Sequence, residues 1–487
     1  MKLALAATPP AADLLVLILG KSESPSKAMK SILGPDMSKQ VEARIKAKDF
    51  EGEEGQSLSL FWDEGKWKRV VLLGRGEQEK WVPQSMEFLG AKCMDLCKAA
   101  KAKTASIFVQ EKDLQDFANG AALGVYEFKK YKTEDKKAVE LKEVHLVSSV
   151  NANTKKIIKR AEIFMRVSEE TRDLINTCAG NQNPQDIADE AVRVAKKYKM
   201  SVTVFDDKKL QKMGCGALYA VGQGAKVGSR LVILEHRYKS KAKQPNLALI
   251  GKGITFDTGG LNLKPSGHIE DMKLDMCGAV TVLGTLQAIA DAQIPGYFVG
   301  VMACAENALS DRSVHPGDVV TAYNGKTIEI NNTDAEGRMV LSDALSYTIK
   351  HFKPQCMVDL ATLTGAVTVA LGYHITGVMG NNQAFIDEYM DCSQKMGERS
   401  WPLPLDEDFV KACKGKFSDL INATDGVRAG SIMGGAFLKH FTDDKIPWIH
   451  LDIAGSGWVE RPTPTSKYGA TAVGIRTLVE LAERHSG

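Results

Sequence analysis

The sequence is poor in the groups that most often bind zinc or form disulfides. Its nine cysteines are scattered and form no C-x-x-C pair, and its nine histidines form no H-E-x-x-H or H-x-H motif. This excludes the common cysteine and histidine zinc sites. The scattered cysteines are typical of a reducing compartment, so we expect a cytoplasmic protein. Any metal site must be built mostly from oxygen ligands, with lysine nitrogen as a further donor.

Other absences narrow the range of functions. No segment approaches the ~20 apolar residues of a membrane span. The 63 basic and 60 acidic residues nearly balance, so the composition demands neither nucleic acid nor an anionic membrane as a partner. The chain also lacks a G-x-S-x-G elbow and a G-x-x-x-x-G-K-[ST] loop. A serine hydrolase and a phosphate-loop enzyme are therefore without support.

Strand and helix signals alternate along the chain. Apolar runs predict strands at residues 14–19, 57–62, 70–73, 105–109, 144–147, 231–234, 247–250, 297–301 and 357–360. This alternation predicts an α/β protein whose sheets are mixed or mostly parallel and flanked by helices. We expect two domains: a smaller one at 1–150, a connecting helix at 151–177, and a larger catalytic domain at 178–487.

The segment Asn-Thr-Asp-Ala-Glu-Gly-Arg at 332–338 is the most informative part of the chain. Asp334 and Glu336 would point the same way from an extended backbone, and two like charges repel unless a cation lies between them. Arg338 opens an apolar-periodic stretch, where a helix N-terminus offers N–H groups to an anion. Taken alone, the segment fits two interpretations equally: a metal site beside an anion site, or a turn that caps a helix.

A second candidate segment follows the strand predicted at 247–250. Lys252 and Asp257 are five positions apart, so a regular strand would point them to opposite faces. The flanking glycines permit a bulge or turn that brings both side chains to one point. Lys264 follows. Such a lysine is usually a surface charge, but in a crowded charged site it can act as a ligand or bind a developing oxyanion.

Asp275 precedes another apolar helix signal, and by itself a helix cap is the simpler explanation. Taken together, Asp257, Asp275, Asp334 and Glu336 supply four carboxylates from three separated segments. Four converging carboxylates would neutralise two neighbouring divalent cations, an arrangement that activates a bridging water for hydrolysis.

These motifs resemble the leucyl aminopeptidase family. The resemblance is carried by five blocks in the same order, at residues 251–264, 273–278, 332–345, 361–366 and 450–455. It extends over roughly residues 165–487, whereas the first domain is only generically similar to the family's smaller α/β domain. The stretch 176–180 (Asn-Thr-Cys-Ala-Gly) departs from the family's N-x-P-x-N pattern at its last two fixed positions.

The resemblance implies a metal-dependent aminopeptidase with two divalent ions, Zn²⁺, Mn²⁺ or Mg²⁺. The tighter metal would be bound by Lys252, Asp257, Asp275 and Glu336. The more exchangeable metal would be bound by Asp257, Asp334 and Glu336. A hydroxide that bridges the two metals would attack the scissile carbonyl.

The resemblance also implies roles around the metals. Lys264 would stabilise the tetrahedral oxyanion, and Arg338 would hold a bicarbonate that shuttles the proton. Leu363 would lie near that anion. Met272, Thr362 and Ala454 would shape the pocket for the substrate side chain.

The partners implied are peptides with a free amino terminus and, in a homohexamer, further copies of the chain. We expect neither a membrane nor a nucleic acid as a partner. The main alternative is a non-catalytic or nucleic-acid-binding relative of the same family, which would be expected to have lost metal ligands, yet every one is present. A phosphoryl-transfer enzyme is a third interpretation, weakened by the missing phosphate loop.

Overall fold

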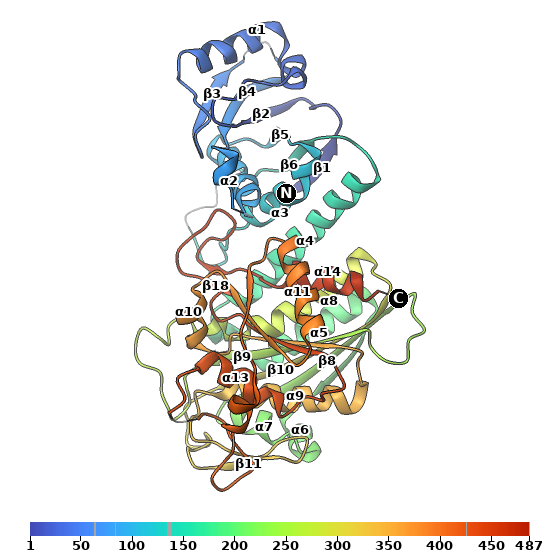
Figure 1. Ribbon diagram of the computed structural model, residues 1–487, viewed down its shortest axis with the longest axis vertical. Helices are drawn as coiled ribbons and strands as arrows, with labels where there is room; N and C mark the ends of the chain where they lie inside the picture. Colours follow the sequence, from blue (N-terminus) through green and yellow to red (C-terminus); the bar gives the residue numbers. More distant parts are fainter. Residues whose placement is uncertain (63–64, 83, 134–138, 425, 487) are drawn as a thin grey trace. The chain divides into compact units, whose positions relative to one another are not determined.

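The computed structural model describes residues 1–62, 65–82, 84–133, 139–424 and 426–486 (Figure 1). The chain forms two compact units. The first contains Met1–Arg166 and Arg461–Lys467, and the second contains Val167–Glu460 and Tyr468–Gly487. Helix α4 (Ala152–Asn176) includes the point at which the chain passes from the first unit to the second.

The first unit is built on a six-stranded mixed sheet in the order β1-β6-β5-β2-β4-β3. Neighbouring strands are parallel except β3, which is antiparallel to β4. The strands are β1 (Lys2–Ala6), β2 (Ala12–Leu19), β3 (Ser57–Phe61), β4 (Trp67–Gly74), β5 (Thr104–Phe108) and β6 (Glu143–Val147). Five of them match the apolar runs, whereas β1 was not predicted.

Helices cover both faces of this sheet, so its central strand is apolar on both sides. Leu14 and Val16 of β2 pack in one core with α2 (Ser85–Ala99) and α3 (Leu114–Gly124), while Leu15 and Leu17 pack in another with α1 (Lys27–Lys46). Helix α1 is interrupted at Gly34, whose φ of 74° leaves the helical region. Pro35 follows and has no N–H to continue the ladder.

The second unit is built on an eight-stranded mixed sheet in the order β15-β14-β17-β13-β9-β10-β8-β7. The strands are β7 (Ser201–Phe205), β8 (Arg230–Tyr238), β9 (Leu247–Asp257), β10 (Gly296–Asn307), β13 (Met357–Ala361), β14 (Thr376–Gly380), β15 (Ser400–Pro402) and β17 (Trp448–Asp452). The central strands β10, β9, β13 and β17 run parallel to one another. Their carboxyl ends therefore meet at one edge, where ligand sites of α/β folds lie.

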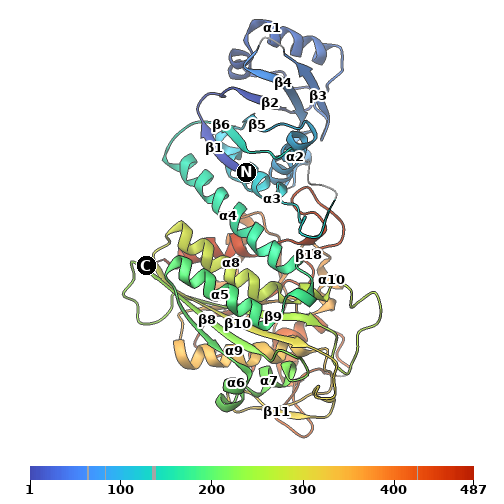
Figure 2. The same cartoon turned by 180° about the vertical axis from the view of Figure 1, so that it is seen from behind.

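Helices form a layer on each face of this sheet (Figures 1 and 2). One layer holds α5 (Pro184–Tyr198), α8 (Cys277–Ala292), α11 (Gln383–Lys395) and α14 (Ile475–Arg484). The other holds α6 (Asp207–Met213), α7 (Gly216–Gly222), α9 (Glu336–Phe352) and α13 (Gly430–Lys439). The α/β class with two mixed sheets is confirmed.

Shorter elements complete the second unit. They are α10 (Gly365–Leu371), α12 (Glu407–Lys411), a sheet of β11 (Val319–Thr321), β12 (Thr327–Glu329) and β16 (Leu420–Ile421), and a pair of β18 (Trp458–Val459) and β19 (Gly469–Ala470). None of the helices in the described part of the chain combines the length and apolar character needed to cross a membrane.

Candidate metal centre

A bulge in β9 brings Lys252 and Asp257 to the same site. Between the pairs Ile254–Ala305 and Asp257–Asn307, β9 advances by three residues while β10 advances by two. The extra residue reverses the alternation of side chains. Lys252 and Asp257, which a regular strand would separate, therefore both face the same group of charged side chains. The bulge that the flanking glycines permit is thus present in the structure.

Lys252 is a buried ammonium that joins two carboxylates. Its Nζ lies 2.8 Å from Asp275 Oδ1 and 2.9 Å from Glu336 Oε1, and it donates to the Thr362 carbonyl oxygen at 2.8 Å. Its side chain is only 3% exposed. A Cβ on Gly337 would lie 2.6 Å from Lys252 Nζ, so the absence of a side chain there leaves room for the lysine.

Lys264 joins the other two carboxylates. Its Nζ lies 2.8 Å from Asp257 Oδ2 and 2.5 Å from Asp334 Oδ1. Asp334 Oδ1 has no hydrogen-bond partner among the described residues, so its contact with Lys264 is an ion pair. Two lysines and four carboxylates thus form one cluster at the carboxyl ends of the central strands.

The local backbone differs from the sequence expectations in two places. Asp275 does not cap α8: it lies in the 3₁₀ helix η4 (Met272–Met276), and the N-cap of α8 is Met276 without a side-chain cap. The backbone from Asp334 to Glu336 is a turn and not extended, and α9 begins at Glu336, two residues before Arg338. The carboxylates of Asp334 and Glu336 converge nevertheless, because Asp334 lies in the turn before α9 and Glu336 in the first turn of that helix.

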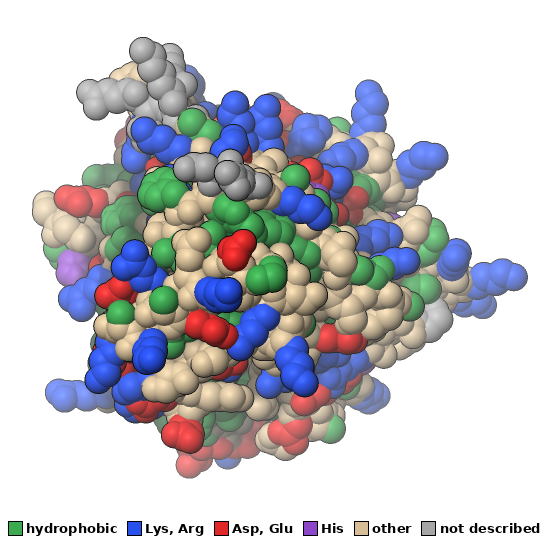
Figure 3. All heavy atoms as spheres, turned by 90° about the horizontal axis from the view of Figure 1, so that it is seen from above, with side chains coloured by type: hydrophobic (Ala, Val, Ile, Leu, Met, Phe, Trp, Pro, Cys, Tyr) green, Lys and Arg blue, Asp and Glu red, His purple; other side chains and the backbone are tan. Residues whose placement is uncertain are grey.

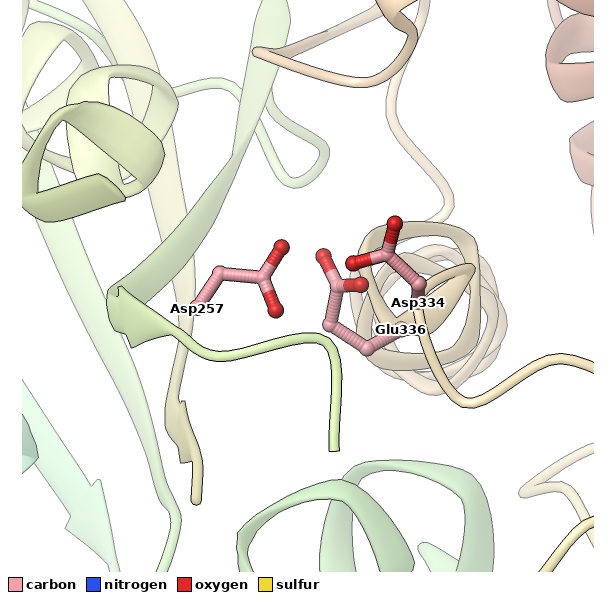
Figure 4. Close-up of side chains that lie close together, drawn as sticks. All are labelled: Asp257, Asp334 and Glu336. Carbon is pink, nitrogen blue, oxygen red and sulfur yellow. The ribbon is translucent and has the colours of Figure 1, made fainter. Parts of the chain in front are cut away.

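The carboxylates of Asp257, Asp334 and Glu336 face one another in Figure 4. Each offers one oxygen within 4.8 Å of the others, a spacing that suits a shared cation. Asp275 Oδ2 and Glu336 Oε2 are buried and have no hydrogen-bond partner among the described residues. Buried acceptors are normally satisfied, so these oxygens fit the hard-cation ligands of a metal centre.

Burial and like charge shift the protonation of these carboxyl groups. Burial raises the pKa of Asp275 to about 8, with Glu336 acting in the same direction and Lys252 opposing it. Burial and the neighbouring Glu336 raise the pKa of Asp257 to about 6. In the absence of metal, ionisation of these carboxyl groups is therefore unfavourable, and a bound divalent cation would make it favourable.

The lysines respond in the opposite sense. Burial acts to lower the pKa of Lys252, but the carboxylates of Asp275 and Glu336 raise it above its ordinary value. Burial likewise acts to lower the pKa of Lys264, but Asp257 and then Glu336 raise it above its ordinary value. Both lysines are therefore cations here, and each offsets the repulsion between the carboxylates that it joins.

Amide side chains that the sequence analysis missed hold the cluster in place. Asn307 Nδ2 donates to Asp257 Oδ1 at 2.8 Å and to the Thr333 carbonyl oxygen at 3.0 Å. Asn262 and Thr333 exchange side-chain and backbone hydrogen bonds, which fixes the loop of Lys264 against the loop of Asp334. Asn307 ends a buried strand at the site edge, and that position is the signal that could have identified it.

Arg338 lies in the first turn of α9. Its Nη1 donates to the Asn422 carbonyl oxygen at 2.8 Å, whereas its buried Nε has no partner among the described residues. Burial lowers the pKa of Arg338 below its ordinary value. An unpaired guanidinium nitrogen at a helix N-terminus suits an anion.

The residues predicted for the substrate pocket lie around the same edge. Thr362 donates its hydroxyl to Asp275 Oδ1 at 2.7 Å. Leu363 and Ala454 donate their backbone N–H groups to one oxygen of Asp452, each at 3.2 Å. Met272 begins the 3₁₀ helix that carries Asp275, and its side chain is partly buried.

The fold and the site define a class: a two-unit α/β protein whose larger sheet ends in a centre of lysines and carboxylates suited to divalent metal. The model of the cytosol aminopeptidase family, catalytic domain, matches residues 169–479, and that of its N-terminal domain matches residues 16–135. The chain therefore belongs to the cytosol aminopeptidase (leucyl aminopeptidase) family of metal-dependent aminopeptidases.

Individual relatives support this membership. The chain is 37% identical over 461 residues to the cytosol aminopeptidase of Pseudomonas aeruginosa, covering 91% of this chain and 92% of that one. It is 36% identical over 439 residues to a probable cytosol aminopeptidase of Rickettsia canadensis, covering 87% and 86%.

Solved structures agree along nearly the full length. A mutant of tomato leucine aminopeptidase matches with a TM-score of 0.87 and 31% identity, over 99% of this chain and 96% of that one. The bottromycin maturation enzyme BotP, in complex with Mn, matches with a TM-score of 0.85 and 27% identity, over 98% and 100%.

Proposed function

We propose that the chain removes the amino-terminal residue from peptides at a centre of two divalent metal ions. Lys252, Asp257, Asp275 and Glu336 would hold the tighter ion, and Asp257, Asp334 and Glu336 the more exchangeable one. The observation that supports this most is the convergence of four carboxylates, three of which have a buried oxygen with no hydrogen-bond partner among the described residues. The Mn bound to BotP, a relative of the same fold, suits the same oxygen-rich ligand set.

When bound, the two ions supply Lewis-acid activation of the water that attacks the scissile carbonyl. Lys252 must lose a proton to act as a ligand, so metal binding releases protons. Lys264, which pairs with Asp257 and Asp334, keeps its charge and donates to the developing oxyanion. Arg338 holds a bicarbonate as the proton shuttle, and its unpaired Nε supports that role.

The substrates would be peptides with a free amino terminus. Met272, Thr362 and Ala454 would shape the side-chain pocket, with Leu363 near the anion. We further propose a cytoplasmic homohexamer. Val369 and Phe417 are apolar and almost fully exposed, which fits side chains that another copy would cover; sedimentation of the purified protein tests this.

The nucleic-acid-binding alternative gains no support. Figure 3 shows basic and acidic side chains intermingled over one face of the molecule. A nucleic-acid-binding protein would show basic side chains gathered in a stripe. The ligand set that a non-catalytic relative would have lost is also complete.

The test uses protein that has been stripped with a chelator and reloaded with Mn²⁺. We expect leucine release from a leucyl peptide, none from the same peptide with an acetylated amino terminus, and none from Lys264→Ala. Cleavage of the acetylated peptide, or no cleavage by any metal-loaded form of the folded protein, would overturn the proposal.

Metal stoichiometry separates the two proposed sites. Asp334 is assigned only to the exchangeable ion and Asp275 only to the tighter one. Elemental analysis after dialysis should give two ions for the unmodified protein and one for Asp334→Asn, whereas Asp275→Asn should weaken the tighter site. Two tightly held ions in Asp334→Asn would contradict the assignment.

A further inference from the structure

Two adjacent strands at the centre of the catalytic sheet carry polar side chains in an otherwise apolar interior. Asp359 of β13 lies opposite His450 of β17, and Ala361 lies opposite Asp452. The side chains of Asp359, His450 and Asp452 have no exposed surface. Burying charged groups is costly unless each is paired, so their presence calls for a physical reason.

Asp359 and His450 form the inner part of this group. Asp359 accepts hydrogen bonds from Trp448 Nε1 and from His450 Nδ1, both at 2.6 Å. These contacts fix the imidazole and favour its charged form: burial acts against the charge, but Asp359 and then Asp452 raise the pKa of His450. Burial raises the pKa of Asp452, and the imidazole of His450 opposes this shift.

Asp452 joins two separate turns through a single carboxylate. Its Oδ1 accepts the N–H groups of Leu363 and Ala454, each at 3.2 Å. Its Oδ2 accepts the Thr364 hydroxyl at 2.6 Å. Leu363 and Thr364 follow β13, whereas Ala454 follows β17. The two turns that carry the proposed pocket residues therefore share one anchor.

The same anchor reaches the proposed metal ligands through one peptide group. The N–H of Leu363 and the carbonyl oxygen of Thr362 belong to the same rigid peptide plane. Asp452 holds the N–H end of this plane, and Lys252 Nζ donates to its oxygen at 2.8 Å. The Thr362 hydroxyl also donates to Asp275 at 2.7 Å. Rotating this peptide would therefore displace Lys252 and the partner of Asp275 together.

We propose that Asp452 is a positioning residue of this aminopeptidase. It orients the Thr362–Leu363 peptide that holds Lys252, and it fixes that peptide against the turn of Ala454. A single buried carboxylate thus sets both the placement of a metal-ligand lysine and the shape of the side-chain pocket. This inference rests on the proposed placement of the metals and the pocket.

The first test substitutes Asp452→Asn, which keeps the side-chain shape but removes the charge and replaces one acceptor with a donor. We expect kcat/KM for a leucyl substrate to fall roughly 10- to 100-fold, as for partners that orient metal ligands. The KM ratio between leucyl and alanyl substrates should change as well. Calorimetry on the metal-free protein should show weaker Mn²⁺ binding.

The matched control is Asp343→Asn in α9. Asp343 is equally buried and also accepts backbone N–H groups, from Leu218 at 2.8 Å and Tyr323 at 2.7 Å, and neither of these partners is a proposed site residue. We expect Asp343→Asn to lower the melting temperature while Mn²⁺ affinity and the KM ratio stay unchanged. Equal losses of Mn²⁺ affinity in both variants would show a general effect of buried charge and overturn the proposal.

A second pair of variants avoids removing the buried carboxylate. Thr364→Val deletes the hydroxyl that donates to Asp452, and Thr364→Ser retains it. We expect the valine variant to show the same change of KM ratio and Mn²⁺ affinity, and the serine variant to restore both. If Asp452→Asn and Thr364→Val match the unmodified protein within twofold, Asp452 has no positioning role.

These readouts separate this inference from the proposed function. Failure of the unmodified protein to cleave any leucyl substrate would refute the proposed function, while Mn²⁺ binding would still report the effect of Asp452 on Lys252. Normal cleavage by the unmodified protein, together with unchanged Mn²⁺ affinity and KM ratio in Asp452→Asn, would refute only the positioning role.

Discussion

The two units of this protein use the same architecture to different ends. Each has a mixed sheet between helices, with central parallel strands whose carboxyl ends meet at one edge. In the first unit that edge holds a hollow of about 20 Å³, which is room for one water molecule. In the second unit the same kind of edge holds the lysine and carboxylate cluster.

Charge and burial account for the difference. At the edge of the first unit, Arg75 pairs with Glu23 at 2.9 Å and lies over the Trp81 ring, and both charged side chains reach solvent. At the edge of the second unit, Asp257, Asp275 and Glu336 are almost fully buried. The carboxyl ends of parallel strands are a common place for a ligand site. In this protein, the edge that holds the candidate site is the one where buried carboxylates outnumber the cations that pair with them.

The largest expected effect comes from matched substitutions at the two edges. Asp257→Asn should lower kcat/KM roughly 10³-fold, because it removes a carboxylate assigned to both metals. The metal-free variant should be no less stable than the unmodified protein, since burial and the neighbouring Glu336 disfavour the negative charge that is removed. Asp113→Asn makes the same change beside the hollow of the first unit and should leave activity unchanged. Activity of Asp257→Asn within tenfold of normal would contradict the assignment.

A smaller effect is expected from the amide that holds Asp257. Asn307→Ala removes donors to Asp257 Oδ1 and to the Thr333 carbonyl oxygen. Mn²⁺ affinity should fall roughly 10- to 100-fold. The free energy of unfolding should fall by about 1–3 kcal/mol, because two buried acceptors each lose one donor, although Asp257 Oδ1 keeps the Gly259 N–H. Calorimetry and denaturant unfolding measure the two effects. Unchanged Mn²⁺ affinity would show that Asp257 holds its position without the amide.

The sequence was sufficient to predict the α/β class and the carboxylates that meet in the second unit. The apolar runs carry the first prediction, because buried parallel strands need them. The carboxylates stood out because Asp334 and Glu336 repel one another unless a cation intervenes. The sequence only permitted the bulge of β9: a regular strand would separate Lys252 from Asp257, and the flanking glycines allow the backbone to deviate.

The supporting residues could not be predicted in the same way. Asn307 and Asp452 act through partners that are 50 or more residues distant in sequence, namely Asp257, Leu363 and Thr364. The end of a buried strand is a weak signal for such residues, because Asn and Asp are also common where a strand passes into a turn. Only strand order and register bring these groups together, so their roles become visible in the structure.

The pH dependence of stability should distinguish the two edges. In the metal-free protein, Asp275 and Asp257 have pKa values raised to about 8 and about 6. The folded state therefore binds more protons than the unfolded state between about pH 4 and pH 8, and the free energy of unfolding should increase as the pH falls through this range. Each group contributes at most about 1.4 kcal/mol per pH unit.

Two carboxyl groups of the first unit should have the opposite effect: they should lower the free energy of unfolding as the pH falls, and in a lower pH range. Hydrogen bonds from Lys68 lower the pKa of Asp13, and bonds from Ser149 and Asn151 lower that of Glu111. Their stabilisation is present above about pH 4 and is lost as the pH falls further. Denaturant unfolding with a chelator measures both ranges. Asp275→Asn should flatten the slope between pH 5 and pH 8, and an unaltered slope would exclude Asp275 as its source.

The smallest effect on stability is expected from substitution of Arg75, the charged residue at the sheet edge of the first unit. Arg75→Ala removes an ion pair with Glu23 and the contact with the Trp81 ring, which together should lower the free energy of unfolding by about 1 kcal/mol. Arg75→Lys should restore part of this, because it keeps the charge without the planar group. Neither variant should alter kcat/KM or Mn²⁺ affinity. A tenfold loss of either would mean that the first unit's edge is coupled to the reaction, and that buried charge alone does not separate the two edges.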